Sequence, residues 1–163
     1  CGSSNTDVAS DIDVFKEIAS EKKEGVLRGA DLGASISEVK LNEPHGLTED
    51  DSTYLFYEFV LDTTTNYTVA YNFEKDSLNE IRVDVYLHDD EDAAALIEKF
   101  KEYFSGKYNV QPQNSVVTNW DWGIDTNTSL LRIELADESA DYNFRGKTSI
   151  TIYGEEKLGN EPL

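Results

Sequence analysis

The sequence predicts an α+β fold, built as an antiparallel sheet with helices packed on one face. Two observations predict this class. Several segments alternate apolar and polar residues with the period of a strand, and a long segment between them carries apolar residues at helical spacing. The order of the segments is helix, short helix, three strands, helix and three strands. This order indicates two α-βββ halves that divide near residue 88.

The length and composition indicate one folded domain. The chain has 163 residues, of which 39% are hydrophobic and 11% aromatic, so it can bury a core and is not a disordered acidic tail. We expect residues 1–10 to form a flexible tether and residues 155–163 to form a frayed tail. The domain is expected over residues 11–154, with halves at 11–88 and 89–154.

Two short helices are expected at the start of the first half. Residues 11–22 place their apolar side chains on one helical stripe, and Gly25 is expected to end this helix. Ser35, followed three residues later by Glu38, forms a capping box that predicts the start of the second helix. Pro44 limits how far this second helix can extend.

Three strands are expected to complete the first half. Residues 53–61 are rich in aromatic and β-branched types, and residues 67–73 alternate, with residues 62–66 between them. This arrangement predicts a hairpin. Residues 81–87 carry apolar side chains at odd positions and mainly polar ones at even positions, so we expect one face to meet the core and the other to meet water.

The strongest helical pattern opens the second half. Asp89 is suited to capping its N-terminus, and Gly106 is expected to end it. Strands are then expected at residues 115–123, 129–135 and 147–153. The apolar stripe of this helix must lie on the sheet. The stripe consists of Ala93, Leu96, Ile97, Phe100 and Phe104.

The charge of the chain limits its partners. Lysine and arginine number 14 against 33 aspartates and glutamates, which gives a net charge of −19. Binding to nucleic acid needs clustered cations that displace counterions from phosphates, so we expect no nucleic-acid partner. Anionic membrane surfaces repel the same charge, so a membrane attachment would need some other anchor.

The first residues resemble the mature end of a bacterial lipoprotein. Cys1 is the only cysteine, and the residues that follow it are almost all small or polar. In that family a signal peptide is removed before a cysteine that then carries diacylglycerol and an acyl chain. The resemblance implies a lipid anchor at Cys1 and a location in the bacterial cell envelope, periplasmic or surface-exposed. The alternative is that Cys1 is a free thiol that happens to come first.

A second resemblance begins at residues 32–39, which read Leu-Gly-Ala-Ser-Ile-Ser-Glu-Val, and continues through the strands at 67–73 and 78–85. These segments resemble small envelope lipoproteins related to the outer-membrane assembly lipoprotein of the SmpA/OmlA type and to the tandem β-lactamase-inhibitor-protein fold. Such proteins act by binding other proteins. The chain lacks the paired cysteines of the inhibitor protein, and its second half has no clear copy of the helix motif, so neither specific activity is carried over. The closer resemblance is to a Bacteroides-type envelope lipoprotein.

No catalytic or cofactor signature stands out. The sequence has no Gly-x-Ser-x-Gly motif, no phosphate-binding loop and no dinucleotide fingerprint. His45 and His88 are far apart in sequence, and the acidic clusters lack the spacing of a calcium-binding loop. We therefore expect no enzymatic activity, no cofactor and no metal site.

The most suggestive aromatic feature is the pair Trp120 and Trp122, which flank Asp121 on a predicted strand. Alternate positions on a strand share a face, so both indoles are expected on one side. They could form a platform for a sugar or a peptide. The alternative is that they cover the sheet beneath a helix. We name Trp120, Trp122 and Asp121 as candidate binding residues.

Three functions follow from these observations. The first is a non-enzymatic protein-binding or scaffold lipoprotein that uses its sheet face or a sheet edge. The second is a carbohydrate-binding accessory protein, for which exposed Trp120 and Trp122 beside a carboxylate would be the sign. The third is an acidic inhibitor or immunity-type protein that blocks a basic enzyme through charge complementarity.

We predict that Cys1 carries lipid in the native organism. Each buried methylene stabilises membrane attachment by roughly 0.8 kcal/mol, so two or three acyl chains anchor firmly where one does not. Mass spectrometry of the native N-terminal peptide should show the added mass, and a Cys1→Ser variant should leave the membrane fraction. An unmodified Cys1 in the native organism would contradict the prediction.

Overall fold

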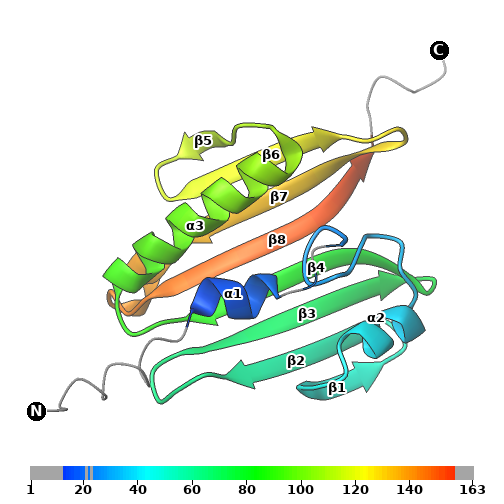
Figure 1. Ribbon diagram of the computed structural model, residues 1–163, viewed down its shortest axis with the longest axis horizontal. Coiled ribbons are helices and arrows are strands. Elements are labelled where there is room, and N and C mark those ends of the chain that lie inside the picture. The colour runs from blue at the N-terminus through cyan, green and yellow to red at the C-terminus, as the bar shows by residue number, and fades with distance from the viewer. Residues whose placement is uncertain (1–12, 21, 23, 157–163) are drawn as a thin grey trace, which may run out of the picture.

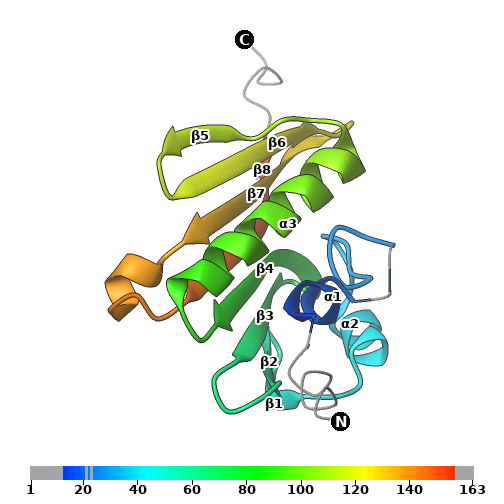
Figure 2. The ribbon, with the colours of Figure 1, turned by 60° about the vertical axis from the view of Figure 1, so that its left-hand side comes forward.

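The computed structural model describes residues 13–20, 22 and 24–156. It confirms the α+β class, because the α-helices pack on one face of a single eight-stranded antiparallel sheet (Figures 1 and 2). The strand order is β1-β2-β3-β4-β8-β7-β6-β5. Cys1, the expected tether at residues 1–10 and residues 157–163 of the expected tail lie outside the described residues.

The two halves follow one another along the chain and have the same plan, in which helix precedes a meander of four strands. The first half comprises α1 (Val14–Ala19), α2 (Ile36–Asn42), β1 (Leu47–Asp51), β2 (Tyr54–Val60), β3 (Asn66–Glu74) and β4 (Ser77–Tyr86). The second half comprises α3 (Asp90–Tyr108), β5 (Gln113–Val116), β6 (Asn119–Asp125), β7 (Ser129–Asp137), the 3₁₀ turn η2 (Ser139–Tyr142) and β8 (Lys147–Glu156).

Each half has one strand more than the sequence analysis expected. The additional strand of the first half is β1, and the strand expected at 115–123 is divided into β5 and β6. Both β1 and β5 are outer strands whose residues are all exposed, so they show no burial alternation that a sequence pattern could reveal. The halves are therefore α-ββββ units.

The two halves are joined by antiparallel pairing between β4 and β8. The register runs from Glu80 opposite Tyr153 to Tyr86 opposite Lys147. The strand order is symmetrical about this pair, since each half contributes its last strand to the centre and its first strand to an outer edge. Pairing at the centre makes one continuous sheet with a shared core.

The apolar stripe of α3 forms the middle of this core. All five residues that the sequence analysis assigned to the stripe are buried, and Phe100 and Phe104 are completely so. The ring of Phe104 lies 5.5 Å from that of Trp122 on β6. The alternation predicted for residues 81–87 is confirmed, because the odd positions from Ile81 to Leu87 are buried.

The helix ends agree with the sequence in part. The capping box is confirmed, with the Glu38 amide donating to Ser35 Oγ at 3.2 Å and the Ser35 amide donating to the Glu38 carboxylate at 3.4 Å. The expected end of α3 at Gly106 is wrong. The helix continues to Tyr108 and ends at Asn109, which adopts the left-handed conformation that asparagine tolerates.

Two further boundaries differ from expectation. The first helix covers only Val14–Ala19 rather than residues 11–22, and it ends at Ser20 instead of at Gly25. At the other end of the chain, Glu155 and Glu156 belong to β8 rather than to a frayed tail, because they pair with β7. Within the described part of the chain, no helix is both long and apolar enough to cross a bilayer.

A buried ion pair holds the loop between α1 and α2 against the sheet. The Arg28 guanidinium donates to both carboxylate oxygens of Glu43, at 2.7 and 2.9 Å. It also donates to the main-chain carbonyls of Glu17 and Ile18, both at 2.8 Å. The Tyr71 hydroxyl donates to Glu43 at 2.8 Å. The Arg28–Glu43 pair thus joins the end of α1, the end of α2 and strand β3.

We predict that Arg28→Met lowers the free energy of unfolding by about 3 to 5 kcal/mol, because it leaves the buried Glu43 carboxylate without its cation. The double variant Arg28→Met with Glu43→Gln should be more stable than Arg28→Met, since no buried charge is then unpaired and the introduced amide can still accept from Tyr71. Urea unfolding at pH 7 measures both variants. A double variant no more stable than the single one would contradict this explanation.

Candidate functional site

One hollow lies on the helix side of the sheet and has a volume of about 440 Å³. It is bounded by α1, α3 and the turn between β2 and β3. Asp13 and Lys99 on its rim approach each other to 3.8 Å, and His88 also lines it. His45 lies elsewhere, in the loop between α2 and β1. The fold therefore does not bring the two histidines together.

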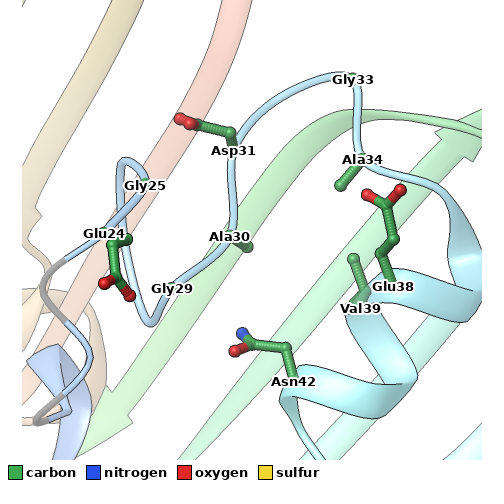
Figure 3. Close-up of a pocket in the computed structure, with 10 residues that line it drawn as sticks. All are labelled: Glu24, Gly25, Gly29, Ala30, Asp31, Gly33, Ala34, Glu38, Val39 and Asn42. Carbon is green, nitrogen blue, oxygen red and sulfur yellow. The ribbon is translucent and has the colours of Figure 1, made fainter.

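A second hollow of about 350 Å³ lies between the loop that follows α1 and the helix α2 (Figure 3). Three carboxylates line it, from Glu24, Asp31 and Glu38. Figure 3 shows that they point in different directions, with the Asp31 side chain directed away from Glu38. The Asn42 side-chain amide already has a partner within the protein, because it donates to the Arg28 main-chain carbonyl at 2.7 Å. The hollow has no convergent set of polar groups.

The tryptophans predicted on one strand face do lie on one face of β6, and it is the face beneath α3. Trp122 is completely buried, and its indole donates to Ser105 Oγ at 3.2 Å. Trp120 is partly buried, with Lys101 Nζ 4.9 Å from its ring. Trp122 therefore covers the sheet beneath a helix, and the pair does not form an exposed platform.

Asp121 lies on the opposite face of the sheet from the two indoles. Its carboxylate is 3.9 Å from the Arg132 guanidinium on the neighbouring strand. Near the outer edge of the sheet, Trp120, Asp121 and Arg132 line a hollow of about 250 Å³. The structure thus brings two of the three candidate residues to one hollow and places Trp122 in the core.

The most extensive candidate surface is the face of the sheet opposite the helices, which we call the open face. Figures 1 and 2 show every α-helix on the other side. The registers place one row of side chains across it, running from β1 to β6. This row consists of Glu49, Phe56, Ala70, Arg82, Thr151, Glu134 and Asp121.

Carboxylates far outnumber cations on the open face. Its carboxylates are those of Glu49, Asp51, Glu58, Glu80, Asp84, Asp121, Asp125, Glu134 and Glu155. Its cations are those of Arg82, Arg132 and Lys147. The excess makes the open face a region of negative potential.

Each of the cations on the open face is already paired with carboxylates. Lys147 is buried, and its ammonium contacts Asp84 at 2.8 Å and Glu138 at 2.9 Å. Arg82 donates to both oxygens of Asp84, at 3.1 and 3.2 Å. Arg132 lies 2.9 Å from Glu155. The positive charges are thus neutralised within the protein.

The pairs at the centre of the sheet shift the pKa values of their members. Burial acts to raise the pKa of Asp84, but the hydrogen bonds and charges of Arg82 and Lys147 outweigh it and lower this pKa below its usual value. Burial acts to lower the pKa of Lys147, and the carboxylates of Asp84 and Glu138 outweigh it, so this pKa is raised. Both groups stay charged at neutral pH.

One end of the open face is bordered by the η2 turn. The ring of Tyr142 makes an edge contact with Tyr86, with ring centres 6.2 Å apart. Both rings lie close to the Lys147 ammonium, which is 5.2 Å from the centre of Tyr86 and 5.6 Å from that of Tyr142. The η2 turn thus lies beside the open face at the ends of the central strands β7 and β8, away from the edge formed by β1 and β2.

Comparison with known proteins gives no assignment: no family model, no curated protein and no solved structure matches the chain. The resemblance to envelope lipoproteins therefore stays a prediction. Sequence reasoning named a sheet face or a sheet edge as the binding surface but none of the residues of the open face other than Asp121, although the alternation in residues 81–87 already placed Arg82, Asp84 and Tyr86 on one water-facing side.

We predict that Asp84→Asn lowers the free energy of unfolding at pH 7 by about 1 to 3 kcal/mol, because Lys147 loses one of its carboxylates. Since the folded pKa of Asp84 is lowered, its stabilisation is present above the unfolded pKa near about 4 and is lost as the pH falls through the folded pKa. The difference between Asp84→Asn and the wild type should therefore shrink below about pH 4.

Urea unfolding at pH 7, pH 5 and pH 3 measures this difference. Glu102→Gln on α3 is the matched control, because Glu102 is exposed and lies on the other side of the sheet. It should follow the wild type at each pH. A gap between Asp84→Asn and the wild type that stays constant down to pH 3 would rule out the role assigned to the Asp84 charge.

Proposed function

We propose that this protein is a non-enzymatic protein-binding module and that the open face is its binding surface. The observation that carries the proposal is that eight strands form one continuous face that no α-helix of the described chain covers. Strands about 4.8 Å apart span about 34 Å, and a seven-residue strand runs about 23 Å. The resulting area of roughly 800 Å² is what one partner contributes to a standard protein interface.

The position of the tryptophans favours a protein partner over a glycan. For a carbohydrate-binding accessory protein, the expected sign is that both indoles are exposed beside a carboxylate. Trp122 is completely buried against Phe104, and Asp121 lies on the opposite face of the sheet. The envelope location and the lipid on Cys1 stay predictions that mass spectrometry of the N-terminus tests.

The open face is a better candidate than the sheet edges. At one edge, β1 carries three consecutive acidic residues, Glu49, Asp50 and Asp51, which oppose the addition of another strand. At the other edge β5 is only four residues long. The Asn114 amide there donates to the carbonyls of Val116 and Asn119, at 2.8 and 2.6 Å. Both edges thus carry features that limit strand pairing.

Site-specific photocrosslinking tests the proposal. A photoreactive amino acid replaces Thr151 at the centre of the open face, or Glu98 on the exposed side of α3, in cells of the organism that encodes the chain. We expect Thr151 to give a discrete adduct with another protein, and Glu98 to give none. Adducts of equal yield from both positions, or none from Thr151, would refute the proposal.

A further inference from the structure

The negative charge of the open face is least compensated where β1 and β2 lie. The three strands β1, β2 and β3 contain no lysine or arginine. On β1 and β2, the carboxylates of Glu49, Asp51 and Glu58 face the open side. All three residues are exposed. We call these carboxylates, together with the rings of Tyr54 and Phe56, the acidic corner.

Within the described chain, the carboxylates of the acidic corner lack the cationic partners that Asp84 and Glu155 have elsewhere on the face. Within the described residues, neither Glu49 nor Glu58 forms an ion pair with lysine or arginine. In the same part of the chain, Asp51 accepts only from the amide and hydroxyl of Thr53, at 2.8 and 3.1 Å. The nearby Lys40 pairs with Asp50, which lies opposite Leu55 and so faces the helix side.

Two aromatic rings lie among these carboxylates. Tyr54 and Phe56 are stacked, with ring centres 6.0 Å apart and planes inclined by 19°. The register places Glu49 directly opposite Phe56 and Asp51 directly opposite Tyr54. Both rings are partly exposed. The acidic corner thus combines the faces of two rings with acceptors beside each ring.

The carboxylates of the acidic corner affect the pKa of the Tyr54 phenol. Burial raises its pKa, and the charges of Glu49 and Asp51 raise it further. Since no cation within β1, β2 or β3 offsets these charges, a cation from outside the protein would be attracted to this position.

We infer that the acidic corner binds an arginine or lysine side chain on the surface of a basic protein partner. The inference rests on the proposed function and specifies the chemistry of its partner. A cation over an aromatic ring is attracted by the ring quadrupole. Arginine fits better than lysine, because its planar guanidinium stacks on the ring while its N–H groups donate to Glu49 and Glu58. The charge of the face then steers a basic partner toward it.

An NMR titration tests the inference directly. The probe is an octapeptide of alternating glycine and arginine, and the neutral control is the same peptide with citrulline in place of arginine. We expect the arginine peptide to shift the amide signals of β1 and β2, including those of Glu49, Phe56 and Glu58. The citrulline peptide should leave them unchanged, and added salt should weaken the arginine peptide's binding.

Matched variants separate this site from general attraction to an acidic protein. Glu49→Gln with Glu58→Gln removes two charges from the acidic corner, whereas Glu91→Gln with Glu102→Gln removes two exposed charges from α3. We expect the first pair to weaken binding by about fivefold or more and the second by less than about twofold. Phe56→Leu keeps the net charge and most of the apolar volume but removes one ring, and it should weaken binding by about twofold to fivefold.

Two outcomes would overturn the inference. One is a set of shifts spread evenly over all acidic surfaces, with equal losses for the two charge pairs. The other is an affinity for the arginine peptide that is unchanged both in Phe56→Leu and in the double variant Glu49→Gln with Glu58→Gln. Neither outcome affects the crosslink at Thr151, which lies on β8 away from the acidic corner. If Thr151 still forms its crosslink but the arginine peptide does not bind, the proposed function is retained and only the inference of a basic partner is rejected.

Discussion

The pairing of β4 with β8 is the constraint on which the rest of the structure depends. It joins the last strand of one half to the last strand of the other, and without it each half would be a separate four-stranded meander with an additional unpaired edge. One ion pair crosses the junction on the open side, where Lys147 of β8 contacts Asp84 of β4, and Asp84 also accepts from Arg82 on its own strand. On the helix side, α3 packs its apolar stripe against the sheet. The continuous open face exists because this junction forms.

Charged side chains differ in their burial and in their partners on the two sides of the sheet. On the helix side, Arg28 and Glu43 are buried and satisfied by one another and by main-chain carbonyls, so their contribution is to fix the α1–α2 loop. On the open side, the cations lie on β4, β7 and β8 and are held by neighbouring carboxylates. The outer strands β1 and β2 have acidic residues and no cations. The uncompensated charge is therefore displaced to one end of the face.

Local patterns predicted the elements whose residues carry their own signal. The stripe of α3 and the Ser35–Glu38 capping box depend on residues three or four positions apart, and both were predicted correctly. The edge strands β1 and β5 were missed because exposure on both faces leaves no alternation. For Trp120 and Trp122 the common face was predictable, but the choice between core and solvent was not. That choice depends on where α3 packs, and the open-face rows depend on registers between strands distant in sequence.

On the open face, the electrostatic and the contact contributions to the proposed binding would come from different strands. Surface ion pairs contribute only about 0 to 1 kcal/mol each, so in the proposed complex the acidic corner would supply orientation and a faster encounter more than affinity. Affinity has to come from area excluded from water at the centre of the face. There the small side chains of Ala70 and Thr151 are half-buried and lie on either side of the exposed Arg82. A basic partner would thus be orientated by β1 and β2 and held by contact over β3, β4 and β8.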